Sequence, residues 1–168
     1  MRKDVSPIRQ HVGGAVEIPA AARRAFNARG AFVSMSTVDA DGRPDSAPVG
    51  TAVLRPDGEL FLLQGPLDRS YENLQANPQA VLMITDNSIL RWLRFFFTCR
   101  YGKAHGWRIH CRLKDELPLG EPYLSEALET KFGGARQTKG GRAIASTLKR
   151  VLLFEVHDVR EVVWRPAS

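Results

Sequence analysis

The sequence predicts a mainly β protein, a β-barrel of antiparallel strands with flanking helices. Two observations support this prediction. Between residues 31 and 84, runs rich in β-branched and aromatic residues are separated by Asp-Gly turns. The run 151–164 alternates apolar and polar residues in its second half and predicts a closing strand pair. A chain of 168 residues with 43% hydrophobic residues is sufficient for one domain with its own core, so we expect a single domain over residues 1–168.

Two consecutive hairpins are expected in the first half of the chain. Their turns contain Asp41-Gly42 and Asp57-Gly58, where glycine tolerates the positive φ of a tight turn. The expected strands cover residues 31–38, 46–54 and 59–63, and a further strand covers 80–84. A helix is expected from Pro19 to near Gly30, because proline suits a first helical turn and glycine a helix end.

A short helix between the third and fourth strands is the strongest functional candidate from the residues alone. It is expected to begin at Asp68 as N-cap and to stop before Pro78, with Asn73 and Asn77 capping or terminating it. A helix N-terminus offers unpaired N–H groups and a partial positive charge, so Arg69 and Ser70 could hold a phosphate monoester there. The alternative is that Arg69 is an ordinary solvated arginine at a helix start.

The order of these elements resembles the FMN-binding split barrel of the pyridoxamine phosphate oxidase-like family. The residues that carry the resemblance are Asp41 to Pro44, Asp57-Gly58 and Arg69 to Pro78, and it is clearest over residues 31–84. It implies a split β-barrel with FMN bound at the short helix and along the strand after the first turn.

The resemblance also implies a set of cofactor-binding residues. Arg69 would be the main phosphate ligand, with Ser70 beside it where family members often have a second Lys or Arg. The backbone of the strand after the first turn would follow the isoalloxazine edge, and the end of the next strand would flank the ribityl chain or ring. These positions are Val49, Gly50, Thr51, Leu63 and Gln64. Val49 and Leu63 are equally compatible with barrel core, and Gly50 with a bulge.

By the same resemblance, the protein would be a homodimer with FMN sites between subunits. It would act as a flavin-dependent oxidoreductase on an unknown small-molecule substrate, with no side chain required as general acid or base. A deazaflavin coenzyme or haem are alternative cofactors. The alternative function is a non-catalytic module that binds a flavin, deazaflavin, haem or single-stranded nucleic acid.

The charge pattern allows partners other than a flavin. The formal net charge is +6 and favours acidic partners. Residues 86–112 interleave six Lys or Arg with aromatic residues, a pattern that single-stranded nucleic acid binders use. The consecutive Phe95-Phe96-Phe97 favours instead a strand buried on both faces, so nucleic acid is the weaker hypothesis.

A helical and basic insertion is expected over residues 113–150, before the last strands, and an N-terminal arm over 1–16. Within the insertion, residues 131–150 contain six bases and no acids, and two Gly-Gly pairs. They predict a mobile loop that attracts anions, as a lid or an RNA surface. The alternative is ionic pairing with the acidic segment 113–129.

Composition argues against other classes of site. Cys99 and Cys111 lack the spacing of a zinc site, and no metal is predicted. The chain has no apolar run approaching the ~20 residues of a membrane span, and its start lacks the apolar stretch of a signal peptide. We therefore expect a cytoplasmic protein without a membrane partner.

Overall fold

The computed structural model describes residues 16–31, 33–85 and 106–162. Three predictions fall outside these residues: the N-terminal arm, most of the basic and aromatic segment 86–112, and the position of Trp164.

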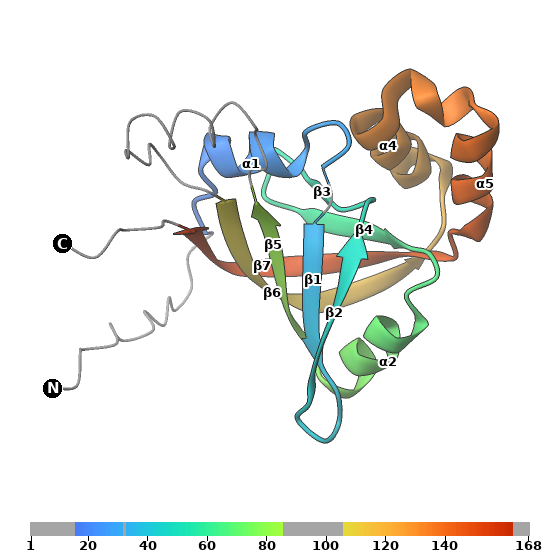
Figure 1. The fold of residues 1–168 in the computed structure, drawn as a ribbon. Helices are drawn as coiled ribbons and strands as arrows, with labels where there is room; N and C mark the ends of the chain where they lie inside the picture. The colour runs from blue at the N-terminus through green and yellow to red at the C-terminus, as the bar shows by residue number, and fades with distance from the viewer. Residues whose placement is uncertain (1–15, 32, 86–105, 163–168) are drawn as a thin grey trace, which may run out of the picture.

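Seven strands form one antiparallel sheet, which confirms the mainly β class (Figure 1). Their order across the sheet is β2-β1-β5-β6-β7-β4-β3. The strands are β1 (Val33–Val38), β2 (Pro44–Val49), β3 (Val53–Leu54), β4 (Leu60–Gln64), β5 (Gln79–Thr85), β6 (Gly106–Pro118) and β7 (Arg150–Val162). The pairing of β6 with β7 shifts register between His110 and Cys111 and again between Leu113 and Asp115. Such irregularities bend the two long strands.

The predicted hairpins are present, but the prediction of one continuous strand over residues 46–54 is wrong. Gly42 and Gly58 have φ of 82° and 91°, as the turns require. The predicted strand 46–54 is two strands, because the chain leaves the edge of β1 after Val49 and joins the edge of β4 at Val53. β2 and β3 are the two edge strands of the sheet. The chain between Val49 and Val53 can nevertheless span at most about 14 Å. The sheet therefore has to curl, and the predicted barrel results.

Helices cover the ends and sides of this barrel. They are α1 (Ala20–Phe26), α2 (Asp68–Ala76), α4 (Glu121–Phe132), the 3₁₀ turn η1 (Gly133–Gln137) and α5 (Lys139–Thr147). In Figure 1, α1 and α2 lie on opposite sides of the curled sheet, and α4 and α5 lie together beside it. The helix from Pro19 is confirmed, with Pro19 preceding its first residue, but it ends at Phe26.

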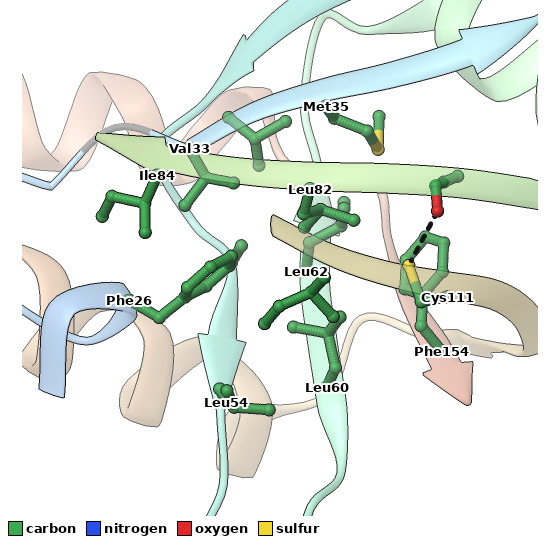
Figure 2. Packing of buried hydrophobic residues seen from close by; sticks show 14 of the residues in the cluster. Phe26, Val33, Met35, Leu54, Leu60, Leu62, Leu82, Ile84, Cys111 and Phe154 are labelled. Carbon is green, nitrogen blue, oxygen red and sulfur yellow. Dashed lines mark hydrogen bonds between the residues drawn. The ribbon is translucent and has the colours of Figure 1, made fainter. Parts of the chain in front are cut away.

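The core fills the inside of the barrel, as Figure 2 shows for Phe26, Met35, Leu62 and Leu82. The strand β4 is buried on both faces. Leu60 and Leu62 belong to the core inside the barrel, whereas Phe61 and Leu63 belong to a second cluster against α4. By this alternation, the side chain of Gln64 lies on the same face as those of Leu60 and Leu62.

The segment 131–150 is not a loop, which corrects the prediction. Residues 113–118 belong to β6, and α4, η1 and α5 occupy 121–147. The Gly-Gly pairs do not loosen the chain, because Gly141 is packed so closely that an added Cβ would lie 2.4 Å from the Ala135 carbonyl oxygen. Thr138 caps α5 by accepting a hydrogen bond from the Gly141 amide (3.1 Å). The ionic pairing with the acidic segment, named as the alternative, is present in part, since Arg136 lies 3.6 Å from Glu129 and Arg150 lies 3.2 Å from Glu116.

The C-terminal run also differs from the prediction of a strand pair. Residues 150–162 form the single long strand β7, which pairs with β4 at its start and with β6 along its length. Its start therefore lies beside the end of β4, with Arg150 opposite Gln64.

Lys131, one of the six bases of the predicted loop, is a buried residue of α4. Its side chain is 2% exposed, and its ammonium donates a hydrogen bond to the carbonyl of Phe26 at the end of α1. The Lys131 carbonyl in turn accepts from the Gly30 amide (3.0 Å). Burial lowers the pKa of Lys131 to about 8. This lysine fixes α4 to α1 and cannot attract an anion from solvent.

Candidate cofactor-binding site

The start of α2 is open to an anion. Asp68 is the first helical residue and does not cap the helix, which corrects that prediction; Leu67 precedes it, and no described side chain caps this end. The first amides of a helix without a cap lack acceptors and carry the positive end of its dipole. Pro78 stops the helix as predicted, since α2 ends at Ala76.

Arg69 lies in this first turn and is accessible. Its side chain is 68% exposed, and its Nη2 lies 3.5 Å from Oδ2 of Asp39. Asp39 follows β1, and its Oδ1 accepts from the amides of Asp41 and Arg43 at 3.0 and 2.8 Å, which fixes the carboxylate in the turn. A single long contact to an exposed arginine is weak, so an incoming anion can replace it.

The rest of α2 is held firmly against the barrel. Ser70 is buried. Asn73 is buried as well and donates to the hydroxyl of Thr37 in β1 (3.0 Å), so it does not cap the helix as predicted. Asn77 does end the helix, and its Oδ1 accepts from the Gln79 amide (3.1 Å). Arg69 therefore extends from a fixed helix.

We predict that Asn73→Ala lowers the free energy of unfolding by about 1–2 kcal/mol, because the buried Thr37 hydroxyl loses its partner. Chemical denaturation measures this value. The double variant with Thr37→Val should lose less than the sum of the two single variants. Strictly additive losses would contradict a direct bond between these side chains.

Gln64 lies at the helix start and has an unpaired acceptor. It is 2% exposed, and its Nε2 donates to Oδ1 of Asp68 (3.3 Å). Its Oε1 is buried and has no hydrogen-bond partner among the described residues. Buried polar atoms are rarely left unpaired, so this oxygen calls for a donor from a ligand or water.

The remaining predicted residues make no described contact with the start of α2. Thr51 is buried, and its hydroxyl donates to the carbonyl of Leu63 (2.8 Å). The Leu63 side chain packs in the cluster against α4, and Val49 packs in the barrel core. Gly50 is half-buried. The structure thus joins Thr51 to Leu63 and brings Gln64 to the helix start, whereas Val49 has the core role named as its alternative.

A polar cluster that the sequence did not reveal lies around Tyr71 of α2. The Arg150 guanidinium lies 4.4 Å from the ring centre of Tyr71 and donates to the Tyr71 hydroxyl (2.5 Å) and to Glu116 (3.2 Å). Burial raises the pKa of Glu116, but hydrogen bonds from Tyr71, Gln75 and Arg150 outweigh it, and the net shift is downward. Arg150 keeps a buried Nε without a partner among the described residues. The sequence feature that could have indicated this cluster is the basic pair Lys149-Arg150, which directly precedes the apolar run of β7.

The sequence profile of the family described as "Pyridoxamine 5'-phosphate oxidase" matches residues 19–162. The chain belongs to this family. The fold is accordingly the predicted split barrel. No curated protein sequence gave a match.

Solved structures agree with the pyridoxamine 5'-phosphate oxidase fold. An FMN-binding protein from Syntrophomonas wolfei subsp. wolfei is 20% identical, with a TM-score of 0.62 over 86% of this chain and 85% of that one. A protein described as an F420 reductase is 13% identical, with a TM-score of 0.58 over 85% and 98% of the two chains. The Group A Streptococcus protein HupZ is 16% identical, with a TM-score of 0.58 over 86% and 94%. At these identities the likeness establishes the fold alone.

Other kinds of site find no support in the described parts of this pyridoxamine 5'-phosphate oxidase family member. No group of three His, Cys, Asp or Glu side chains within 16–31, 33–85 and 106–162 could hold a metal ion. Over the same residues, none of the helices is long and apolar enough to span a membrane. Cys111 is buried, and its thiol donates a hydrogen bond to the Ala80 carbonyl (3.6 Å, Figure 2). Burial raises the pKa of this thiol, so it is not a reactive cysteine.

Proposed function

We propose that this protein binds FMN at the start of α2 and acts as a flavin-dependent oxidoreductase on a small molecule. The observation that carries the proposal is the uncapped first turn of α2, which presents the exposed Arg69 and whose Asp68 accepts a hydrogen bond from Gln64, a side chain with an unpaired buried acceptor. A phosphate monoester fits the first feature, because amides at a helix N-terminus and a guanidinium both donate to its oxygens.

The residues present fit FMN in a second respect. The buried Oε1 of Gln64 requires a donor, and the cofactor carries hydroxyl donors between its phosphate and its ring. Arg69 and the first amides of α2 would hold the phosphate, with Ser70 behind them and Gln64 beside the chain that leads to the ring. Gly50, Thr51 and Leu63 would contribute backbone along the ring edge, and Val49 would support it from the core.

When bound, FMN would supply the redox chemistry. The part of the chain described here supplies binding and orientation. No side chain is assigned as general acid or base. His110 of β6 alternates with the core residues Ile109 and Cys111, so its side chain lies on the other face of this strand, where its Nε2 is buried without a hydrogen-bond partner among the described residues. We also propose a homodimer with the cofactor between subunits, as the family resemblance implies.

Fluorescence titration tests the binding proposal. FMN fluorescence should change on saturable binding, and a deazaflavin coenzyme and haem, titrated separately, should bind more weakly. Preference for the deazaflavin would replace FMN in the proposal, and no saturable flavin binding would reject it. Sedimentation equilibrium with and without FMN would test the dimer, and a monomer in both states would reject that part.

A further inference from the structure

The first turn of α2 supplies only one cation of its own. Arg69 is that cation, since the next side chain, Ser70, is neutral and buried. A phosphate monoester carries between one and two negative charges near neutral pH. A site built on this turn alone would leave part of that charge without a counterion.

A second cation reaches the same turn from a distant part of the chain. The Nζ of Lys149, the residue that precedes β7, lies 2.7 Å from Oδ1 of Asp68. The Lys149 amide donates to the Gln64 carbonyl (2.8 Å), which fixes the backbone of this lysine beside the end of β4. Its side chain is 50% exposed, so the ammonium can move while the backbone stays in place.

An independent feature indicates that a ligand belongs between these groups. Gln64 is almost completely buried, its Nε2 and the Lys149 ammonium share the same Asp68 oxygen, and its Oε1 has no partner among the described residues. The side chain that carries the unpaired atom therefore shares its Asp68 contact with Lys149. Asp68 also directly precedes Arg69 in the first turn of α2, so both cations and Gln64 are connected to this turn.

We infer that Lys149 is the second cation of the phosphate site and supplies the charge that Ser70 does not. Arg69 leans toward Asp39 at the end of β1, and Lys149 approaches Asp68 from the start of β7. Arg69 belongs to α2 itself and Lys149 to the segment just before β7, and the proposed phosphate position is at the helix start between these two cations. This inference rests on the proposed function.

Without ligand, each cation is paired with one carboxylate. Arg69 contacts Asp39, and Lys149 contacts Asp68. The Asp68 carboxylate is 66% exposed and competes with a phosphate both for Lys149 and for the helix dipole. Substitutions of these two residues should therefore have opposite effects. Loss of Lys149 should weaken phosphate binding, and loss of the Asp68 charge should strengthen it.

The test compares FMN with riboflavin, which lacks the phosphate, by fluorescence titration at low ionic strength. Lys149→Ala should raise the dissociation constant for FMN about tenfold and leave that for riboflavin unchanged, because one charge-assisted contact is lost. Lys149→Arg should retain most of the FMN affinity. Lys139→Ala, which removes an exposed lysine of α5 and changes the net charge equally, should alter neither constant.

Asp68→Asn provides the opposite result, an FMN affinity several-fold higher with riboflavin affinity unchanged. Equal losses for both flavins in Lys149→Ala would show that the lysine only supports the fold, and equal FMN affinity in wild type and variant would remove it from the site. Either outcome would overturn the inference while leaving FMN binding established. Failure of the wild-type protein to bind either flavin would overturn the proposed function itself.

Discussion

Arg69→Glu should raise the dissociation constant for FMN about 100-fold, and Arg69→Ala at least tenfold. The alanine variant loses one charge-assisted contact, about 1.4 kcal/mol or more, and the glutamate adds a repulsive charge at the helix start. Arg69 is 68% exposed, and its ion pair among the residues that the structure describes is a 3.5 Å contact to Asp39, so these substitutions should not disturb the fold. Fluorescence titration of FMN measures the effect.

The matched control for this charge reversal is Arg24→Glu. Arg24 is an exposed residue in the last turn of α1, which lies across the barrel from α2 (Figure 1). It changes the net charge by the same amount, so it corrects for the general attraction of a basic protein for an anion. If both reversals weaken FMN binding equally, the effect is nonspecific and Arg69 is not a ligand.

The second large effect is a dependence of stability on pH that comes from Lys131. Burial holds its pKa at about 8 in the folded protein, against 10.5 for the free side chain. Between these values the unfolded chain binds more protons than the folded one, so the free energy of unfolding rises with pH. Relative to Lys131→Met, which has no titrating group here, the wild type should gain about 2–3 kcal/mol between pH 7 and pH 10.

Denaturant titrations of both proteins across this pH range give the difference directly. Lys139→Met serves as control, because Lys139 is exposed and its substitution should leave the pH dependence of the wild type intact. A difference between wild type and Lys131→Met that is constant from pH 7 to pH 10 would show that the ammonium remains hydrated in the folded protein.

The sequence predicted the parts of the fold that short-range chemistry specifies. Gly42 and Gly58 take the positive φ that their Asp-Gly turns imply, and Pro78 stops α2. The break after Val49 was missed, because it depends on which distant strand edges are free, and no local pattern records that. The single strand β7 was missed for the same reason, since it joins partners far apart in the chain.

The charged segment 131–150 shows the same limit. Its composition resembles that of a loop, but tertiary packing overrides it: Gly141 allows close contact with the Ala135 carbonyl, and Lys131 is drawn into the interior to meet Phe26. The candidate site was partly predictable, since Arg69 lies in the first turn of α2 and Gln64, at the end of β4, donates a hydrogen bond to Asp68 in that turn. Lys149 and Arg150 could not be placed there, because their proximity arises from the pairing of β7 with β4.

If this barrel binds FMN, the absorption spectrum of the purified protein will show it. The purified protein would be measured before and after incubation with FMN and removal of unbound ligand on a desalting column. Binding predicts that a flavin band at about 450 nm stays with the protein, and that Arg69→Glu retains much less of it. A wild-type protein that leaves the column colourless after incubation would show that the barrel does not bind FMN.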